Sequence, residues 1–335
     1  MPLLRLRDGK RGSAATVLER RNQDALNVIV TEGLTKCYGK IIALDDLNLK
    51  IAKEHCVGFL GPNGAGKSTT IKILCNLIRP TQGKAYVLGF DVSAEAEKAL
   101  KNIGAIVEVP EFYPFLNPKE TLSYLGKLRG MTGSVLEERI REVLELVRLR
   151  EWADTKIGNF SRGMKQRLGI AQAVLHDPEV LILDEPALGL DPRGMYEIRE
   201  IIKTLVAEGK TVFLASHMLH EVRELCDSVA LINKGKLIAH DNVENLEKIF
   251  KVQQIEIETL KPPTKKQKKE MAEFKAVRQV TIQNNRITVE FEGDETQRAE
   301  FLGFLIKKVG MPIISFNPSS KGLEEVYLRL VKEVS

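Results

Sequence analysis

The chain has 335 residues, and its hydrophobic content of 43% is enough to build one large or two modest buried cores. No apolar run approaches the roughly 18 residues of a membrane-spanning helix, and the basic N-terminus lacks the apolar core of a secretion signal, so we expect a cytoplasmic protein. The net charge of +5 is too small to indicate nucleic acid by itself, and the four widely separated cysteines argue against a disulfide framework or a zinc site.

The chain begins with a polar, basic stretch that shows no helical or alternating period. We interpret residues 1–26 as a flexible extension rather than as a membrane-docking arm. From Asn27 onward, short β-branched segments alternate with turn residues, which predicts a small antiparallel sheet. Tyr38 lies in this region beside Gly39, and its position alone is as typical of a core aromatic as of a ring that stacks on a nucleotide base.

The sequence GPNGAGKST at Gly61–Thr69 fits the phosphate-loop pattern G-x-x-x-x-G-K-[ST]. The apolar run Val57–Leu60 predicts a strand before the loop, and a helix is expected at Lys67–Ile78. The glycines let backbone N–H groups close around a polyphosphate, Lys67 adds positive charge, and the Ser68 hydroxyl is suited to Mg²⁺. The nucleotide-binding residues predicted here are Gly61, Pro62, Asn63, Gly64, Ala65, Gly66, Lys67, Ser68 and Thr69.

Further along the chain, after the phosphate-loop helix, the sequence predicts a mainly helical region. We expect helices at Ala94–Lys101, Lys119–Arg129 and Val135–Arg148, and a strand at Ile103–Val107. That strand ends at Glu108 and continues into a proline-broken aromatic loop, which cannot be regular helix before about Lys119. The amphipathic spacing of the last helix is typical of core packing, so we interpret residues of about 109–165 as a helical subdomain.

Two further motifs place polar groups at element ends. Ser161 and Gly163 stand just before an Ala/Leu-rich helix, where they form an N-cap and a second potential anion-binding end, although capping serines are common. The apolar run Val180–Leu183 is typical of a buried parallel strand, and it delivers Asp184 and Glu185 at the end where open α/β sheets bind ligands. Asp184 is suited to holding Mg²⁺ through water, and Glu185 to accepting a proton from an attacking water.

The segment Ala187–Pro192 is a turn-rich connector to a helix at Arg193–Glu208. The buried strand Thr211–Ala215 follows and delivers Ser216 and His217, and a lone histidine at a strand end is usually structural. We expect a helix at Leu219–Cys226, a hairpin of Ser228–Ile232 with Lys236–Ala239, and a helix at Asn242–Phe250.

Composition changes near residue 252. The lysine-rich, proline-broken run Lys261–Glu270 is interpreted as a solvated loop rather than as a lipid-binding patch. Alternating runs lie on either side of it, and with a helix at Thr296–Lys308, a strand at Pro312–Phe316 and a helix at Gly322–Val331 they predict a small α+β domain. The expected organisation is an extension at 1–26, an α/β domain at 27–250 and an α+β domain at 251–335.

Together, five motifs between Val28 and Phe250 resemble those of the ATP-binding subunits of ABC transporters. They are the phosphate loop, the signature at Phe160–Met164, the second nucleotide motif VLILDEP, the dimer-contact loop LGLDP, and ASH with its switch histidine. The resemblance implies a P-loop NTPase fold of the ABC ATPase type, with a mixed sheet core, an antiparallel β subdomain and a helical signature subdomain. It also implies ATP hydrolysis, with ATP and Mg²⁺ as cofactors.

The same resemblance assigns roles to single residues. It makes Tyr38 the adenine-stacking residue, and it makes His217 a γ-phosphate contact. In the family, ATP lies between the phosphate loop of one subunit and the signature of another, which implies a homodimer or a heterodimer. The further implied nucleotide contacts are Ser161, Arg162, Gly163, Met164 and Asp191, of which Ser161 and Gly163 come from the other subunit. The implied catalytic residues are Glu185, His217 and Lys67. The implied metal ligands are Ser68, Glu108 and Asp184.

Departures from the commonest family pattern indicate one branch. Glu108 stands where most members carry glutamine, and it adds negative charge near Mg²⁺. In the signature, Phe160, Arg162 and Met164 replace the usual leucine, glycine and glutamine. These variations, and a C-terminal domain ending GLEEVYLRLV, resemble the bacitracin-resistance and multidrug (daunorubicin-type) export branch.

The resemblance implies the motor of an exporter, peripheral on the inner face of the membrane, whose integral-membrane permease is a separate polypeptide. A second hypothesis is an ABC-type ATPase that acts on DNA or ribosomes. Those relatives usually carry long coiled-coil insertions or two cassettes in one chain, and this sequence has neither, so no nucleic-acid partner is expected. A third hypothesis makes the C-terminal domain a regulator, although it shows no ligand motif.

Overall fold

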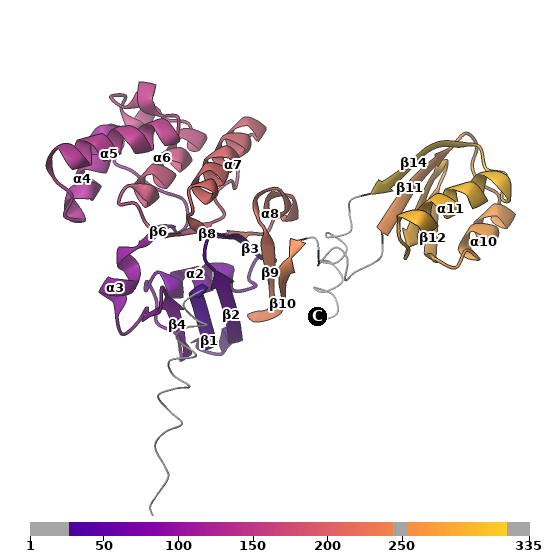
Figure 1. Ribbon diagram of the computed structural model, residues 1–335, viewed down its shortest axis with the longest axis horizontal. Coiled ribbons are helices and arrows are strands. Elements are labelled where there is room, and N and C mark those ends of the chain that lie inside the picture. The colour runs from indigo at the N-terminus through magenta and orange to yellow at the C-terminus, as the bar shows by residue number, and fades with distance from the viewer. Residues whose placement is uncertain (1–26, 244, 246–252, 320–335) are drawn as a thin grey trace, which may run out of the picture. The chain divides into compact units, whose positions relative to one another are not determined.

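The computed structural model describes residues 27–243, 245 and 253–319 (Figure 1). The chain divides into two compact units, Met1–His240 and Asp241–Ser335. The predicted extension at 1–26 and the predicted helix Gly322–Val331 lie outside the described residues, as does most of the predicted helix Asn242–Phe250.

The first unit begins with an antiparallel sheet. Its strands are β1 (Asn27–Tyr38), β2 (Ile41–Ala52), β4 (Gln82–Val87) and β5 (Phe90–Asp91), in the spatial order β2-β1-β4-β5. β1 and β2 form a long hairpin in which Tyr38 stands opposite Ile41. Buried and exposed residues alternate along the second half of β2, so one face of this sheet packs inward while the other meets solvent.

The central sheet has six strands in the order β10-β9-β3-β8-β7-β6. They are β3 (Cys56–Leu60), β6 (Ile103–Ile106), β7 (Val180–Asp184), β8 (Thr211–Ser216), β9 (Ser228–Asn233) and β10 (Lys236–Asn242). The pairs from β9 to β6 are all parallel, and every residue of β3, β7 and β8 is buried. Their carboxyl ends therefore meet at one edge of the sheet, where ligand sites form.

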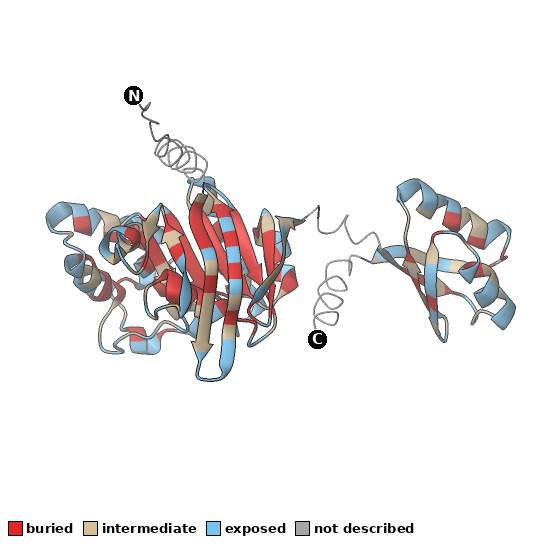
Figure 2. Cartoon of the chain, turned by 90° about the horizontal axis from the view of Figure 1, so that it is seen from below, coloured by how far each residue is buried: buried red, intermediate tan, exposed pale blue. Residues whose placement is uncertain are grey.

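Helices cover both faces of the central sheet (Figure 1). They are α2 (Lys67–Leu74), α3 (Ala96–Lys101), α4 (Pro118–Leu128), α5 (Gly133–Leu146), α6 (Arg162–Val174), α7 (Pro192–Ala207) and α8 (Leu219–Leu225), with 3₁₀ turns at Arg150–Trp152 and Ile157–Asn159. α2 lies between the two sheets, and their shared core includes Phe59, Ile71 and Phe213. α4, α5 and α6 pack on one another on the other side of the central sheet. Buried residues concentrate in the central strands (Figure 2).

The second unit is a sheet covered on one face by two helices. Its strands follow the order β12-β13-β11-β14 and are antiparallel throughout. The elements are β11 (Gln253–Thr259), α10 (Lys265–Ala272), β12 (Val277–Gln283), β13 (Arg286–Phe291), α11 (Glu295–Lys307) and β14 (Ile313–Ser319). Phe291 of the sheet and Phe301 of α11 are fully buried and their ring centroids lie 5.3 Å apart.

Two expectations about local structure are wrong. The run Lys261–Glu270 is not a solvated loop throughout, because α10 begins at Lys265 behind a capping box between Thr264 and Gln267 and is anchored by buried Met271. The helix expected at Lys67–Ile78 ends at Leu74. Within the described part of the chain, none of the helices combines the length and apolarity that crossing a membrane requires.

Candidate active site

The phosphate loop joins β3 to α2 and surrounds a buried ammonium group. Gly66, which precedes the helix, has a φ of 110° that favours glycine, and a Cβ there would collide with the carbonyl oxygen of Ala43. The Lys67 side chain is 6% exposed, and its Nζ donates to the carbonyl oxygens of Gly61 at 2.8 Å and Pro62 at 3.3 Å. The Lys67 ammonium and the N-terminus of α2 thus both place positive charge at the phosphate loop, which suits a polyphosphate.

Two neighbouring strands deliver Glu185 and His217 to this loop. Glu185 Oε2 lies 2.9 Å from His217 Nδ1, and Glu185 Oε1 lies 3.5 Å from Lys67 Nζ. The Glu185 backbone N–H donates to the carbonyl oxygen of Ala215 at 2.9 Å, and its φ of 48° is a strained value for a residue with a side chain. The three residues predicted to be catalytic therefore form one connected group.

Asp184 stands behind this group with an unsatisfied oxygen. It is 6% exposed, the Ser68 side chain hydrogen-bonds to it, and its buried Oδ1 has no hydrogen-bond partner within the described residues. Burial raises the pKa of Asp184, and the neighbouring charge of Glu185 raises it further. A hard cation would give Oδ1 a partner and offset both effects, so the donor set of Ser68 and Asp184 fits Mg²⁺.

Glu108, the third predicted metal ligand, follows β6 at the same edge of the sheet. Its Oε1 lies 2.7 Å from Nζ of Lys72 on α2, and a hydrogen bond from that ammonium holds the pKa of Glu108 below its usual range. Like Glu185, Glu108 has a positive φ, here 66°. In this structure the Glu108 carboxylate is paired with Lys72 and its side chain is largely exposed.

A cavity of about 460 Å³ collects most of the predicted phosphate-loop and catalytic residues. Its walls are Ala43, Asn63, Gly64, Gly66, Lys67, Ser68, Thr69, Glu185, Leu188 and His217. Ala43 lies outside every motif named from the sequence, and Leu188 belongs to the dimer-contact loop LGLDP but was not predicted to line the site. Tyr38, Glu108 and Asp184 do not line this cavity, although Asp184 reaches it through Ser68.

Tyr38 lies at the tip of the hairpin of β1 and β2 and is 48% exposed. The Nζ of Lys36 lies 5.0 Å from the centre of its ring and donates to the carbonyl oxygen of Arg79 at 2.8 Å. One face of the ring is thus occupied by a fixed cation. An aromatic side chain with this exposure is not a core residue, so the interpretation of Tyr38 as a core aromatic is excluded.

The signature residues lie outside the cavity. Ser161 caps α6, where its Oγ accepts from the backbone N–H of Met164 at 3.2 Å. The Arg162 guanidinium rests against Gly189 of the dimer-contact loop and leaves no room for a side chain there. Asp191 caps α7 by accepting from the Gly194 N–H at 3.0 Å. None of these residues lines the phosphate-loop cavity of its own chain.

A buried carboxyl group beside the site was missed by the sequence analysis. Glu221 on α8 is 4% exposed and accepts a hydrogen bond from the Ser216 hydroxyl at 2.9 Å. An acidic residue in the first turn of a helix is commonplace, so its position in the sequence gave no sign that it is buried.

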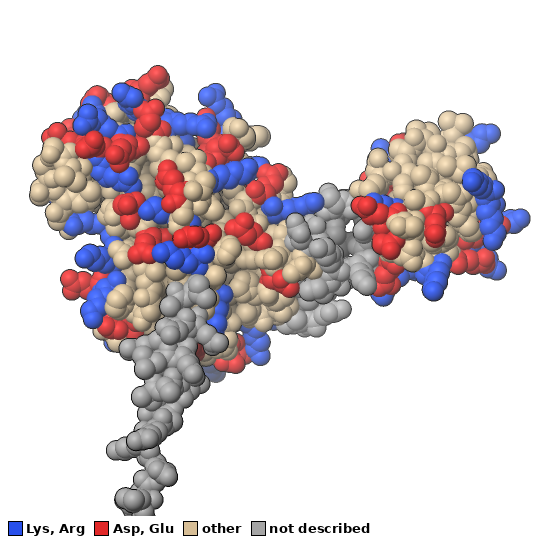
Figure 3. Space-filling model, viewed as in Figure 1, with Lys and Arg blue, Asp and Glu red and all other residues tan. Residues whose placement is uncertain are grey.

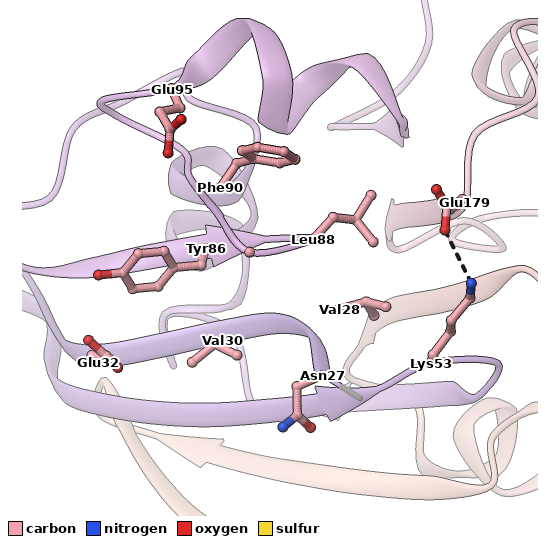
Figure 4. Close-up of a pocket in the computed structure, with 11 residues that line it drawn as sticks. Asn27, Val28, Val30, Glu32, Lys53, Tyr86, Leu88, Phe90, Glu95 and Glu179 are labelled. Atoms are coloured by element: carbon pink, nitrogen blue, oxygen red, sulfur yellow. Dashed lines mark ion pairs between the residues drawn. The ribbon is translucent and has the colours of Figure 1, made fainter. Parts of the chain in front are cut away.

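A second cavity, of about 670 Å³, lies on the antiparallel sheet (Figure 4) and contains none of the predicted site residues. Its apolar floor includes Val30 and Leu88. Two of its carboxylates already have cationic partners, since Glu179 pairs with Lys53 at 3.3 Å and Glu95 with a lysine on α3. We assign no ligand to it.

Comparison with known proteins gives consistent matches. A model of the ABC transporter family matches residues 44–188. Over 222 residues the chain is 45% identical to the bacitracin transport ATP-binding protein BcrA of Bacillus licheniformis, which covers 66% of this chain and 72% of that protein. Over 300 residues it is 33% identical to YxlF, an uncharacterized ABC transporter ATP-binding protein of Bacillus subtilis (strain 168), which covers 90% and 98%.

A solved structure also matches this chain. It is a dimeric ATP-binding cassette in a post-hydrolysis state bound to ADP and Pi, with a TM-score of 0.58 and 26% identity, covering 64% of this chain and 98% of that one. The match with YxlF, by contrast, is long enough to extend into the second unit.

Proposed function

Because the chain belongs to the ATP-binding proteins of ABC transporters, we propose that it is the motor of an exporter, which dimerises around ATP and drives a separate permease. Membership of the family makes it an ATP-binding protein and an ATP hydrolase. The observation that carries the proposal is the connected group of Lys67, Glu185 and His217 at the mouth of the phosphate loop.

Each member of that group has its own task in the proposed reaction. Lys67 exchanges its carbonyl partners for the β and γ phosphate oxygens. Glu185 accepts a proton from water, whose oxygen bonds to the γ-phosphorus while the bond to the ADP oxygen breaks. His217, when protonated, donates from one ring nitrogen to Glu185 and from the other to the γ-phosphoryl oxygens, where negative charge must be stabilised.

Ser68 and Asp184 would hold Mg²⁺, with Glu108 as a further ligand. The metal supplies charge neutralisation on the β and γ phosphates when it is bound. The orphaned Oδ1 of Asp184 and its bond to Ser68 support this assignment. Glu108 would join them either with its second carboxylate oxygen or by giving up its pairing with Lys72.

A second copy would complete the nucleotide site. Ser161 and Gly163 stand at the N-terminus of α6, an end that favours anions, yet they do not line the cavity of their own chain. In a two-fold dimer each signature would face the phosphate loop of the other copy, so both sites would be made from both chains. The dimeric cassette among the similar structures supports this arrangement.

Exposed aromatic side chains between β6 and α4 are the proposed contact with the permease. Tyr113 and Phe115 are 62% and 65% exposed, their rings lie 5.5 Å apart, and Val109 nearby is 59% exposed. Apolar surface of this kind is costly unless a partner covers it. The segment begins at Glu108, at the edge of the active site, so it can transmit a change there to a membrane subunit on the inner face of the membrane.

The alternative, an ATPase that acts on DNA or ribosomes, has less support. Nucleic-acid binding relies on clustered lysine and arginine side chains. On the face shown in Figure 3, the described basic and acidic side chains are interspersed. The relatives' names also refer to transporters.

Turnover measurements test the catalytic part. We expect Glu185→Gln to lower kcat at least about 100-fold while ATP still binds, because it removes the general base. Lys67→Ala should lose nucleotide binding. Glu95→Gln, which alters a surface carboxylate paired with Lys98, is the matched control and should behave as wild type. Wild-type turnover by Glu185→Gln would overturn the assignment.

Co-purification tests the transport part. Tagged Glu185→Gln protein is expressed in its native host, and the membranes are solubilised in mild detergent with ATP present. A stoichiometric multi-span protein is the expected result. Recovery with ribosomes or DNA instead would favour the alternative function.

A further inference from the structure

A buried carboxyl group lies directly behind the catalytic residues without touching the nucleotide cavity. Glu221 is 4% exposed, its Oε2 accepts from the Ser216 hydroxyl, and its Oε1 has no hydrogen-bond partner in the described chain. Burying a carboxyl oxygen without a hydrogen-bond partner lowers stability, and such costs are commonly retained at functional sites. Glu221 does not line the cavity, so any role in the reaction must act through other residues.

Ser216 connects this carboxyl group to the backbone on both sides of His217. Its hydroxyl donates to Glu221 and accepts from the Met218 backbone N–H, with both distances 2.9 Å. Its carbonyl oxygen accepts from the N–H of Gly61, the first residue of the phosphate loop, at 3.4 Å. The residues before and after His217 are thus held by one hydroxyl group, and the same residue contacts the loop that His217 faces.

The helix that carries Glu221 is itself fixed against the strand that leads to the loop. The next residue, Val222, is fully buried and packs on Gly58 of β3 so closely that no Cβ would fit at that glycine. Burial raises the pKa of Glu221 and the hydrogen bond from Ser216 lowers it; the negative charge of Glu185 raises it as well, while His217 lowers it. The carboxyl group therefore shares an electrostatic environment with both catalytic residues.

We propose that Glu221 is a positioning residue for ATP hydrolysis, which orients His217 through the Ser216 hydroxyl. The proposal rests on the proposed role of His217. Misplacing a catalytic group by about 1 Å costs on the order of 100-fold in rate, so Glu221→Ala should lower kcat about 10- to 100-fold. The KM for ATP should change by less than about twofold, since the binding groups stay in place.

Conservative variants separate positioning from general structural support. Glu221→Gln keeps an oxygen that can accept from Ser216, so its kcat should stay within about threefold of wild type. Ser216→Ala should reproduce the Glu221→Ala defect, and it provides the same test if Glu221→Ala does not fold. Glu224→Gln on the same helix, whose carboxylate contacts Arg199 and His220, is the matched control and should keep wild-type kcat.

A double-mutant cycle with His217→Ala decides the question. If Glu221 acts through His217, adding Glu221→Ala to His217→Ala lowers kcat no further. Independent losses that multiply would overturn this inference while leaving the role of His217 intact. A His217→Ala protein with wild-type kcat would instead overturn the role of His217 in the proposed function, and this inference with it.

Discussion

At the scale of single residues, the site is held by contacts that ATP must rearrange. Lys67 Nζ is engaged by two carbonyl oxygens and lies 3.5 Å from Glu185. The phosphates would draw the ammonium away from Glu185 and leave that carboxylate with His217 as its partner. Nucleotide binding would therefore remove one of the two side-chain contacts of the Glu185 carboxylate.

The ring of Tyr38 gives the first prediction at this scale. Lys36 occupies one face, so an adenine would stack on the other. Tyr38→Ala should weaken ATP binding about 5- to 100-fold and leave inorganic triphosphate binding unchanged, because only the base contact is lost. Calorimetry with both ligands measures the difference. Equal weakening for ATP and triphosphate would mean that Tyr38 does not contact the base.

The pair of Glu108 and Lys72 gives the second prediction. If Glu108 helps to hold the metal, Glu108→Gln should raise the Mg²⁺ concentration needed for half-maximal ATPase activity, and chelation by EDTA should stop turnover in every variant. Lys72→Met is the matched variant, because it frees the carboxylate and should lower that concentration. An unchanged Mg²⁺ dependence in both variants would remove Glu108 from the metal site.

At the scale of elements, the sequence predicted site residues that lie within one motif or directly after one strand. It did not predict side-chain contacts between motifs that are far apart in the chain. The phosphate loop is one continuous stretch, and Glu185 and His217 follow strands whose apolar runs mark them as buried and parallel. The contact of Arg162 with Gly189 joins two motifs through side-chain packing, which no local pattern encodes. α10 was missed because its lysines and the prolines before it favoured a loop, whereas the only helical signal was the capping box of Thr264 and Gln267.

The junction of α6 with β6 gives a prediction about pH. His176, after α6, lies 3.0 Å from the carbonyl oxygen of Ile103, and burial lowers its pKa to about 4. The folded chain thus binds fewer protons than the unfolded chain once pH falls below about 6.5, so its stability decreases as pH drops towards 4, by up to about 1.4 kcal/mol per pH unit.

His176→Gln keeps a donor for Ile103 but does not titrate, so it should remove this part of the pH dependence. Urea unfolding can be followed by the fluorescence of Trp152, the chain's single tryptophan, which lies in the first unit. Parallel stability curves for the variant and the wild type between about pH 7 and 5 would contradict the assignment.

At the scale of the whole molecule, the two units have separate cores. Deleting residues 251–335 should leave a protein that folds and hydrolyses ATP at the wild-type basal rate, because every predicted catalytic and nucleotide-binding residue lies in the first unit. Thermal unfolding and ATPase assays of the truncated chain check this. An unfolded product would show that the second unit supports the first.

The separation of the signature from the cavity of its own chain has a genetic consequence. Because each centre would be built from two copies, the pair is the working unit. If that unit needs both of its centres, a cell that makes intact and Glu185→Gln copies in equal amounts forms about three quarters of its pairs with at least one defective member. The share of pairs with two intact members would fall with the square of the fraction of copies that are intact. A damaged allele of this gene would therefore act as a partial dominant, and its severity would rise with its expression level.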